Sequence, residues 1–419
     1  MKLLTKFTLL IITLIFFSCT PEKNQFVEIN GKVVNTDTKS ILLVKPNQDL
    51  RHDSLIEIPI IDGKFHYKSK IKNAEVFDLF LGKAKKIGGG RFMPLFLENA
   101  KITLTIYPEN NFDENIVKGG KLNTEYLKYK KDFDNKFNYK IKPLKDSIGV
   151  LFKRGEYNSD KMDAVLSKLK NAQNQDEKMT LYKKIETLQK SNQHLSPKAK
   201  ILNDKLKIIY KEQEKFQHEY IEKNPTIVSY SFLLKNLIFK NGDVDISFTK
   251  TNYEKLSKAN PNHPYNELVL NLIKAIEDVK VGKKYIDFTA PNLNGNLIKL
   301  SDKIDGKVAI LDLWATWCGP CIGKSRSIVP LYNEFKDKGF TVVGVAGEFK
   351  NTDRLVKFLK KEKLPWINLV ELDRENKIWQ KYNVDGSGGG VFLIDENGII
   401  IAKDPTAKEI RMELESRLN

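Results

Sequence analysis

Short runs near the beginning of the chain alternate apolar and polar residues, the period of two that predicts half-buried β-strands. They cover residues 26–34, 41–45, 55–61, 65–70, 76–81 and 102–107. Asp62-Gly63 separates two of the runs. This dipeptide is a two-residue hairpin signal, because Gly accepts the positive φ of a type I′ turn. We therefore expect a small antiparallel β-sandwich over residues 26–118.

From residue 119 to 282 the apolar residues recur three or four positions apart, which is helical periodicity. Leu181, Ile185 and Leu188 are one example. Proline and glycine interruptions divide the segment, at Ser196-Pro197, Asn224-Pro225, Asn241-Gly242 and between Pro261 and Pro264. The other positions are rich in Lys and Glu, so we expect several helices with solvated outer faces. Such helices more often serve as scaffold than as binding site, and no catalytic constellation is visible in them.

After Gly282 strand-like and helix-like runs alternate, which is the pattern of an α/β domain. The expected elements are strands at 308–314 and 340–345, helices at 318–338, 353–361 and 408–418, and a hairpin of 391–394 with 399–402. A chain of 419 residues is also too long for one ordinary domain. We therefore predict a multidomain protein: a β-sandwich, a helical segment, and an α/β domain over residues 283–419.

The N-terminus has the pattern of an export signal. Two lysines precede the apolar run 9–17, and Ser18 and Cys19 follow it. The run is short for a permanent membrane span, and a small residue before a cysteine is typical of a bacterial lipoprotein cleavage site. We expect residues 1–18 to be a lipoprotein signal peptide and Cys19 to be lipidated. An ordinary secretory signal with an incidental cysteine remains an alternative. Either way the protein is expected in the cell envelope, facing the periplasm, with the inner or outer membrane left open.

Charge narrows the range of partners. Lys and Arg number 70 against 53 Asp and Glu, a formal net charge of +17. Such an excess can indicate nucleic acid or an anionic membrane surface. Here the lysines are spread along the whole chain and alternate with acids, with no basic stripe interleaved with aromatic residues. We therefore expect no nucleic-acid partner.

The chain has three cysteines, and lipidation of Cys19 would leave one pair, Cys318 and Cys321. Two cysteines so close together cannot form a structural disulfide framework. In an exported protein a lone C-x-x-C indicates redox chemistry. A zinc site would need two more ligands, and all five histidines lie far away in sequence. We expect no metal and no organic cofactor.

The stretch Asp312-Leu313-Trp314-Ala315-Thr316-Trp317-Cys318-Gly319-Pro320-Cys321 resembles the active-site segment of thioredoxins nearly residue for residue. With Asp287-Phe288-Thr289-Ala290-Pro291 upstream, the domain from residue 283 resembles the TlpA-like branch of membrane-tethered bacterial thioredoxins. The two preceding segments resemble, in pattern only, the N-terminal modules of Bacteroidetes lipoproteins of this branch. The resemblance implies a thioredoxin fold and thiol-disulfide exchange.

The residue pattern supports the same chemistry. A thiol attacks a disulfide only as thiolate, and a helix N-terminus stabilises that anion, so Cys318 is the expected nucleophile. One helical turn brings Cys321 close enough to resolve the mixed disulfide and form the Cys318-Cys321 disulfide. Gly319 and Pro320 shape the tight entry into the helix. Trp317 is expected at the rim of the site, whereas Trp314, Trp366 and Trp379 are expected in the core.

Asp312 lies between apolar neighbours on the strand before the cysteines, so we expect it to be buried beneath the dithiol. In thioredoxins the matching acid accepts a proton from the resolving cysteine, and burial would raise its pKa toward the working pH. A purely structural buried acid is the alternative.

The chain departs from the thioredoxin pattern in two places. The family has a cis-proline loop opposite the cysteines, but here Ser387, Gly388 and Gly389 occupy that place. We expect a looser substrate groove, and a Gly389→Pro variant to restore affinity for a peptide partner. Where many relatives have a glutamate and a proline after the second cysteine, this chain has Lys324 and Arg326. They either favour the thiolate and acidic partners or point into solvent.

We therefore expect a thiol-disulfide oxidoreductase that reduces disulfides of exported proteins, for example in cytochrome c maturation. Its electrons would come from a membrane-bound dithiol donor. One alternative is a thiol peroxidase, because the Phe288-Thr289-Ala290-Pro291 entry is shared with peroxiredoxins. Another is a surface binding lipoprotein with a vestigial thioredoxin domain, for which the missing proline is the main argument.

Overall fold

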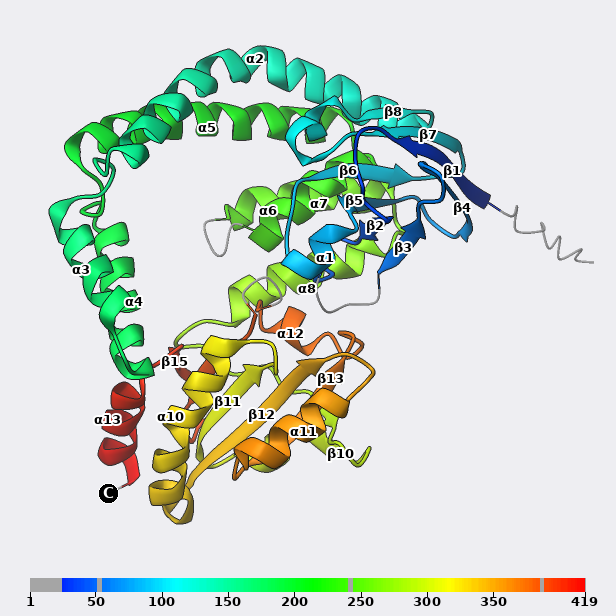
Figure 1. The fold of residues 1–419 in the computed structure, drawn as a ribbon. Helices are drawn as coiled ribbons and strands as arrows, with labels where there is room; N and C mark the ends of the chain where they lie inside the picture. The colour runs from blue at the N-terminus through cyan, green and yellow to red at the C-terminus, as the bar shows by residue number, and fades with distance from the viewer. Residues whose placement is uncertain (1–24, 51–54, 240–243, 385–387, 419) are drawn as a thin grey trace, which may run out of the picture.

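The computed structural model describes residues 25–50, 55–239, 244–384 and 388–418 (Figure 1). Four expectations from the sequence lie outside these residues: the signal peptide 1–18, the lipidation site Cys19, the break at Asn241-Gly242 and the groove residue Ser387. Within the described residues, no helix combines the length and the apolar character that a membrane span needs.

The N-terminal region contains two four-stranded sheets. The first has the order β4 (Lys64–Ile71), β1 (Gln25–Val33), β7 (Lys101–Ile106), β8 (Ile116–Lys118). The second has the order β3 (Ile56–Pro59), β2 (Ser40–Val44), β5 (Glu75–Leu81), β6 (Phe92–Leu97). Apolar side chains from both sheets form one core, with Ile29 and Ile102 from the first and Leu79 and Leu95 from the second.

Strands β1 and β7 pair in parallel, so the prediction of a purely antiparallel arrangement was wrong for this pair. The second sheet lies between them in sequence, and a long connection of this kind lets two strands run in the same direction. The hairpin at Asp62-Gly63 is confirmed: both residues have positive φ, 50° and 70°, and Ile61 and Lys64 exchange both backbone hydrogen bonds. Strand β6 was missed because its run Phe92–Leu97 is apolar almost throughout and contains a proline. A short helix, α1 (Lys83–Ile87), precedes it.

The helical segment is confirmed. Its helices are α2 (Lys121–Lys153), α3 (Asp160–Asn171), α4 (Gln175–Lys190), α5 (Pro197–Lys223), α6 (Ile227–Phe239), α7 (Ile246–Ala259) and α8 (Tyr265–Asp278). The break at Ser196-Pro197 has a clear physical reason, because Ser196 caps α5 by accepting a hydrogen bond from the Ala199 N–H.

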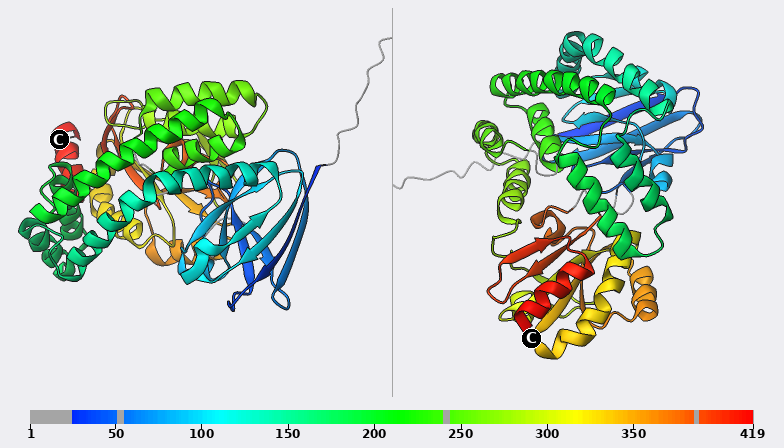
Figure 2. Two further views of the ribbon diagram at one scale, coloured as in Figure 1. Left: turned by 90° about the horizontal axis from the view of Figure 1, so that it is seen from above. Right: turned by 90° about the vertical axis from the view of Figure 1, so that its left-hand side faces the viewer.

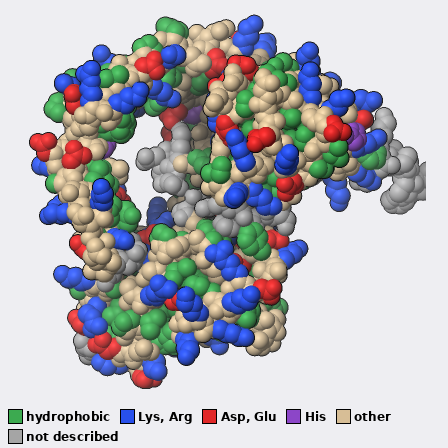
Figure 3. Space-filling view, in the orientation of Figure 1, with side chains coloured by type: hydrophobic (Ala, Val, Ile, Leu, Met, Phe, Trp, Pro, Cys, Tyr) green, Lys and Arg blue, Asp and Glu red, His purple; other side chains and the backbone are tan. Residues whose placement is uncertain are grey.

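Helices α2 and α5 run side by side as a long arm, and α3 and α4 turn back from its end toward the C-terminal region (Figures 1 and 2). There α4 packs against α10, and Lys183 pairs with Glu409 of α13. Helices α6, α7 and α8 pack against the second N-terminal sheet, and Val76 of β5 and Phe96 of β6 belong to the hydrophobic cluster that they share with these helices. Figure 3 shows a deep hollow between the arm and the rest of the molecule.

The C-terminal region has a five-stranded sheet in the order β13 (Ile367–Leu372), β12 (Phe340–Glu348), β11 (Val308–Trp314), β14 (Gly390–Ile394), β15 (Ile400–Lys403). A two-stranded pair, β9 (Thr289–Pro291) with β10 (Leu297–Lys299), and the short helix α9 (Ser301–Ile304) precede it. The other helices are α10 (Gly319–Phe335), α11 (Asp353–Glu362), α12 (Ile378–Lys381) and α13 (Ala407–Leu418). This is the α/β arrangement predicted for this region, although β9, β10, β13, α9 and α12 were not foreseen.

Strand β11 lies in the middle of this sheet, and all seven of its residues are buried. Helices α10 and α13 cover one face, where Ile328 and Ile410 pack on the sheet. The residues after α8 and helix α12 cover the other face, where Tyr285 and Trp379 pack. Because both faces of the sheet are covered, every residue of β11 except Asp312 is apolar.

Candidate active site

The two cysteines lie at the N-terminus of α10, directly after the central strand. Cys318 is the N-cap residue, and its Sγ accepts a hydrogen bond from the Cys321 N–H at 3.3 Å. The two sulfur atoms form a disulfide, with the Cα atoms 5.3 Å apart. Gly319 and Pro320 form the first helical positions, where the missing proline N–H leaves no bond unmade. Once reduced, a thiolate on Cys318 would lie against the N–H groups and the positive end of the helix dipole.

The loop between β11 and Cys318 is held by a buried acid that the sequence analysis missed. Glu348, the last residue of β12, accepts a hydrogen bond from the Thr316 N–H at 2.5 Å. Arg354 donates to the Thr316 carbonyl oxygen at 3.0 Å. Burial raises the pKa of Glu348 above its ordinary value. The only sequence signal was an acid at the end of an apolar strand, and the predicted strand stopped before it.

Trp317 is half-buried beside the disulfide, as predicted for a rim residue. Its ring centroid is 6.0 Å from that of Trp379 in the core. Across the site, a Cβ atom on Gly388 would lie 3.4 Å from the Trp317 ring and 3.9 Å from the Cys318 Sγ. Trp314, Trp366 and Trp379 are buried, which confirms the prediction for these three residues.

The glycine loop approaches the disulfide closely. The Gly388 carbonyl oxygen lies 3.3 Å from the Cys321 Sγ, where a reduced thiol could donate to it. Gly389 has φ +137°, and a Cβ atom there would lie 2.3 Å from the Leu313 carbonyl oxygen. Proline requires φ near −65° and would meet the same backbone oxygen. This geometry argues against the expectation that Gly389→Pro restores a family-like groove, because any side chain at this position would be strained.

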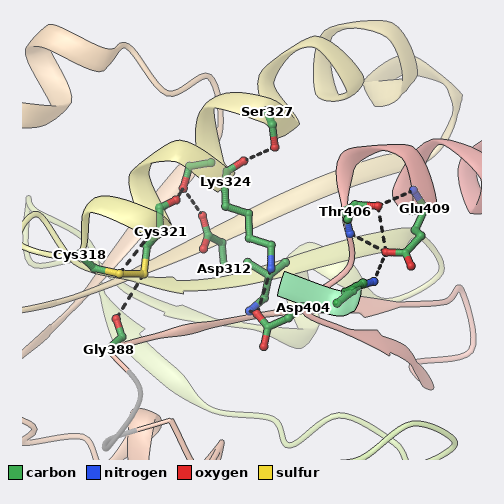
Figure 4. A network of polar contacts seen from close by, with 12 residues as sticks. Asp312, Cys318, Cys321, Lys324, Ser327, Gly388, Asp404, Thr406 and Glu409 are labelled. Atoms are coloured by element: carbon green, nitrogen blue, oxygen red, sulfur yellow. Dashed lines mark hydrogen bonds and ion pairs between the residues drawn. A yellow bond between two sulfur atoms is a disulfide. The ribbon is translucent and has the colours of Figure 1, made fainter. Parts of the chain in front are cut away.

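Asp312 is fully buried, as predicted, and lies beneath the dithiol (Figure 4). The Ser325 hydroxyl donates to its Oδ2 at 2.6 Å. Its Oδ1 has no hydrogen-bond partner among the described residues. Burial raises the pKa of Asp312 to about 6, against a smaller lowering by the Ser325 hydrogen bond and the charge of Lys324. A carboxyl group in this range can accept and release a proton near neutral pH.

The two cations after the cysteines take different places. Lys324 points inward, is buried, and its Nζ lies 3.0 Å from the Asp404 Oδ1 (Figure 4). Asp404 also accepts a hydrogen bond from the Val391 N–H at 3.1 Å. Arg326 lies on the outer face and pairs with Glu362 through two hydrogen bonds of 2.6 and 2.7 Å. The solvent-facing alternative therefore holds for Arg326, whereas Lys324 contributes a buried charge close to Asp312.

The disulfide opens onto a cavity of about 600 Å³. Both cysteines line it, together with Asp312, Lys324 and Asp404. The cavity therefore joins the sulfur atoms, the buried acid and the Lys324–Asp404 ion pair in one space. Such an arrangement can carry out thiol-disulfide exchange with a proton acceptor at hand. Among the described residues, no three His, Cys, Asp or Glu side chains converge in a way that could hold a metal ion.

Comparisons with known families agree with this chemistry. Residues 281–403 match the AhpC/TSA family, and residues 27–126 match a family described as a domain of unknown function (DUF4369). The thiol-disulfide oxidoreductase ResA of Bacillus cereus is 33% identical over 128 residues, covering 30% of this chain and 70% of that protein. ResA of Geobacillus kaustophilus is 34% identical over 142 residues, covering 33% of this chain and 78% of that protein. The names of these relatives favour neither a thiol peroxidase nor a vestigial domain.

Solved structures give similar matches. The thioredoxin domain of a thiol-disulfide oxidoreductase from Bacteroides vulgatus is 27% identical, with a TM-score of 0.31, and the match covers 34% of this chain and all of that one. A thiol:disulfide interchange protein DsbE from Chlorobium tepidum is 30% identical, with a TM-score of 0.30 and the same coverage.

Proposed function

Because this chain belongs to the family of thioredoxin-like thiol-disulfide oxidoreductases, we propose that it uses Cys318 and Cys321 to reduce disulfides of exported proteins. The observation that carries this proposal is the shared cavity, which brings a helix-capping cysteine, its partner thiol and a buried carboxyl group together. The Gly-Pro dipeptide between the cysteines resembles that of reducing thioredoxins and supports the reductive direction.

The exchange takes place in two steps. The Cys318 thiolate attacks one sulfur of the target disulfide, which forms a mixed disulfide and releases the other target sulfur as a thiolate. Asp312 then takes the proton of Cys321, and the Cys321 thiolate attacks the Cys318 sulfur. The Cys318–Cys321 disulfide forms, and the target leaves two electrons richer as two thiolates, of which one takes the proton from Asp312 and the other takes a proton from water. A second dithiol, which we propose is membrane-bound, must reduce the enzyme again.

We further propose that Cys19 is lipidated, so that the protein is anchored to a membrane and works on the periplasmic side. Strand β1 begins only a few residues after Cys19, so an anchor there would hold the N-terminal sheets near the bilayer. These sheets would form a sandwich-like module, with the helices of residues 119–282 as its connection to the redox domain. The supporting features are the signal-like N-terminus and the two sheets that share one core. Apocytochromes c are one class of exported target that fits such a location.

The reduction potential of the dithiol tests this proposal. Thiol trapping of the soluble chain from residue 20 onward, across a glutathione and dithiothreitol series, measures it. A value near that of thioredoxin, about −270 mV, supports a reductase, whereas one near about −120 mV would reassign the protein to disulfide formation. Cys318→Ser should reduce turnover to background, and Cys321→Ser should accumulate the mixed disulfide. Absence of any reversible disulfide would contradict the proposal.

A further inference from the structure

The cavity beside the disulfide has one wall that comes from the helical segment rather than from the redox domain. Ile276, at the end of α8, and Val279 and Lys280, just after it, line the same space as the two cysteines. Val279 is buried and belongs to the apolar cluster that contains Cys318. The sequence pattern had assigned these residues to a scaffold without a role in the chemistry.

This wall is fixed to the redox domain at both ends. Helix α8 packs along α12, where the Asn271 amide approaches the Gln380 side chain at 3.5 Å and Lys377 pairs with Glu267. Beyond the helix, the Gly282 N–H donates to the Ile400 carbonyl oxygen at 2.8 Å. The end of α8 is therefore built into the site.

The lining combines apolar surface with an excess of positive charge. Its apolar members are Ile276, Val279, Leu313, Pro320 and Val391. Its charged members are Asp312, Lys324 and Asp404, with Lys280 and Lys403. Lys324 and Asp404 neutralise each other.

Lys280 and Lys403 are exposed, and the described residues provide neither of them with a carboxylate partner. The Lys403 Nζ lies 5.7 Å from the centre of the Phe392 ring, a cation–π contact that does not neutralise its charge. The rim of the cavity therefore carries two cationic side chains, whereas its interior combines apolar surface with Asp312 and the Lys324–Asp404 ion pair.

We propose that the end of α8 selects the target: the cavity takes an apolar side chain next to the target cysteine, and Lys280 and Lys403 hold an acidic residue close by. The occupant is an extended segment of a disulfide-containing polypeptide. This inference rests on the proposed function, because it concerns the target of the same dithiol. A volume of about 600 Å³ lies in the usual range of binding pockets and exceeds what one disulfide needs. Lys280 and Lys403, which have no carboxylate partner within the described part of the chain, supply the charge complementarity.

Two disulfide-linked peptides test the charge preference, one with Leu and Asp beside the cysteine and one with Leu and Lys. Single-turnover reduction by the pre-reduced protein, residue 20 onward, should favour the acidic peptide by about threefold or more for each lysine. Lys280→Glu should abolish or reverse this preference. Lys274→Glu, an exposed change on the same helix outside the cavity, is the matched control and should leave it intact. Equal rates on both peptides for the unchanged protein would overturn the inference.

A second pair of disulfide-linked peptides tests the apolar part of the proposal. One peptide has Leu beside the cysteine, and the other has Gly in its place. The unchanged protein should reduce the Leu peptide faster, and Ile276→Ala should bring the two rates together. If Ile276→Ala leaves the ratio unchanged, the apolar wall does not contact the target and this part is wrong.

Two small disulfides separate this inference from the proposed function. Hydroxyethyl disulfide is neutral, so the control Lys274→Glu should reduce it at the rate of the unchanged protein, and the peptide rates of the other variants are divided by their own rate on this disulfide. Failure of the unchanged protein to reduce it would count against the proposed function itself. Oxidised glutathione is acidic but is not a polypeptide. If Lys280→Glu slows it as much as the acidic peptide, the rim recognises a small acid and the polypeptide assignment is wrong.

Discussion

The core between the N-terminal sheets and the core beneath the disulfide are built from different kinds of side chain. Between the sheets the buried side chains are apolar, apart from a few hydroxyl and amide groups. Among the described residues, every charged side chain that is buried lies in the C-terminal region: Asp312, Lys324, Glu348 and Glu371. A buried charge destabilises a fold unless it is paired or hydrogen-bonded. The comparison indicates that the core between the N-terminal sheets mainly stabilises the fold. The core beneath the disulfide contains charged groups that lower stability but lie near the reacting sulfur atoms.

The four buried charges are not equivalent. Glu348 accepts the Thr316 N–H and so holds the loop before Cys318, whereas Glu371 accepts two N–H groups and so holds the start of α12. Lys324 has an ion-pair partner. Of these four side chains, Asp312 is the one whose carboxylate has an oxygen without a hydrogen-bond partner among the described residues. Its placement therefore destabilises the fold most, and this is the acid that lies nearest the chemistry.

Asp312→Asn should produce the largest effect on activity, and it should also change the stability. We expect reduction of a peptide disulfide to slow by roughly 10²-fold or more, the usual contribution of a general base. We also expect the free energy of unfolding at pH 8 to rise by about 3 kcal/mol, because a tenfold difference in acidity between the folded and unfolded chains corresponds to about 1.36 kcal/mol. Single-turnover kinetics measure the first effect. Denaturant unfolding of the oxidised protein, followed at the transition of the C-terminal region, measures the second.

The sign of the pH dependence follows from the raised pKa. The unfolded chain releases the Asp312 proton near pH 4, whereas the folded protein keeps it until about pH 6. Between these values the unfolded state binds fewer protons, so rising pH lowers the stability of the unchanged protein. The advantage of Asp312→Asn should therefore grow from about pH 4 to 6 and vanish at acid pH. An advantage that is constant across this range would show that the charge of Asp312 is not its cause.

Leu79→Ala tests the role of the core between the N-terminal sheets. Leu79 is fully buried in the core between the N-terminal sheets, and its truncation should destabilise that region by about 2–5 kcal/mol. The reduction potential and the single-turnover rate should stay unchanged, because Leu79 and the redox-active cysteines belong to different hydrophobic clusters. A clear shift of the dithiol potential in a folded Leu79→Ala protein would show that the two cores are coupled.

The features that were predicted correctly from the sequence depend on residues that are close together in the chain. The turn at Asp62-Gly63 requires only its own two φ angles, and the Cys318 and Cys321 pair requires only one helical turn. Asp312 could be predicted as buried because its strand is apolar on both sides. In each case the evidence lies within a few residues.

The features that were missed join distant segments. Lys324 is buried only because Asp404, far along the chain, supplies its partner. The wall formed by Ile276 and Val279 depends on how α8 packs on α12, and no periodicity reports such packing. The constraint on Gly389 comes from the backbone of Leu313 on another strand. Tertiary packing decided each of these points, so the local pattern carried no signal for them.

Lys324→Gln should have the smallest effect, and it probes how the charges of the site interact. The Lys324 charge lowers the pKa of Asp312, so its loss should raise that pKa further and move the pH dependence of reduction to higher pH. The charge of Asp404 also acts on Asp312 and raises the pKa of Asp312. In the variant, the charge of Lys324 would no longer offset this effect. Asp404 is partly exposed and keeps the Val391 N–H, so the loss of stability should be about 1–2 kcal/mol.

The matched control for Lys324→Gln is Arg326→Gln, two residues further along α10. This change removes an equal charge from an exposed ion pair with Glu362, outside the cavity. It should leave the pH profile of reduction unchanged and lower the stability by less than about 1 kcal/mol. If the two variants shift the profile equally, the effect is one of overall charge. A shift in Lys324→Gln alone would instead assign the tuning of Asp312 to the cation inside the cavity, where low polarity strengthens its field.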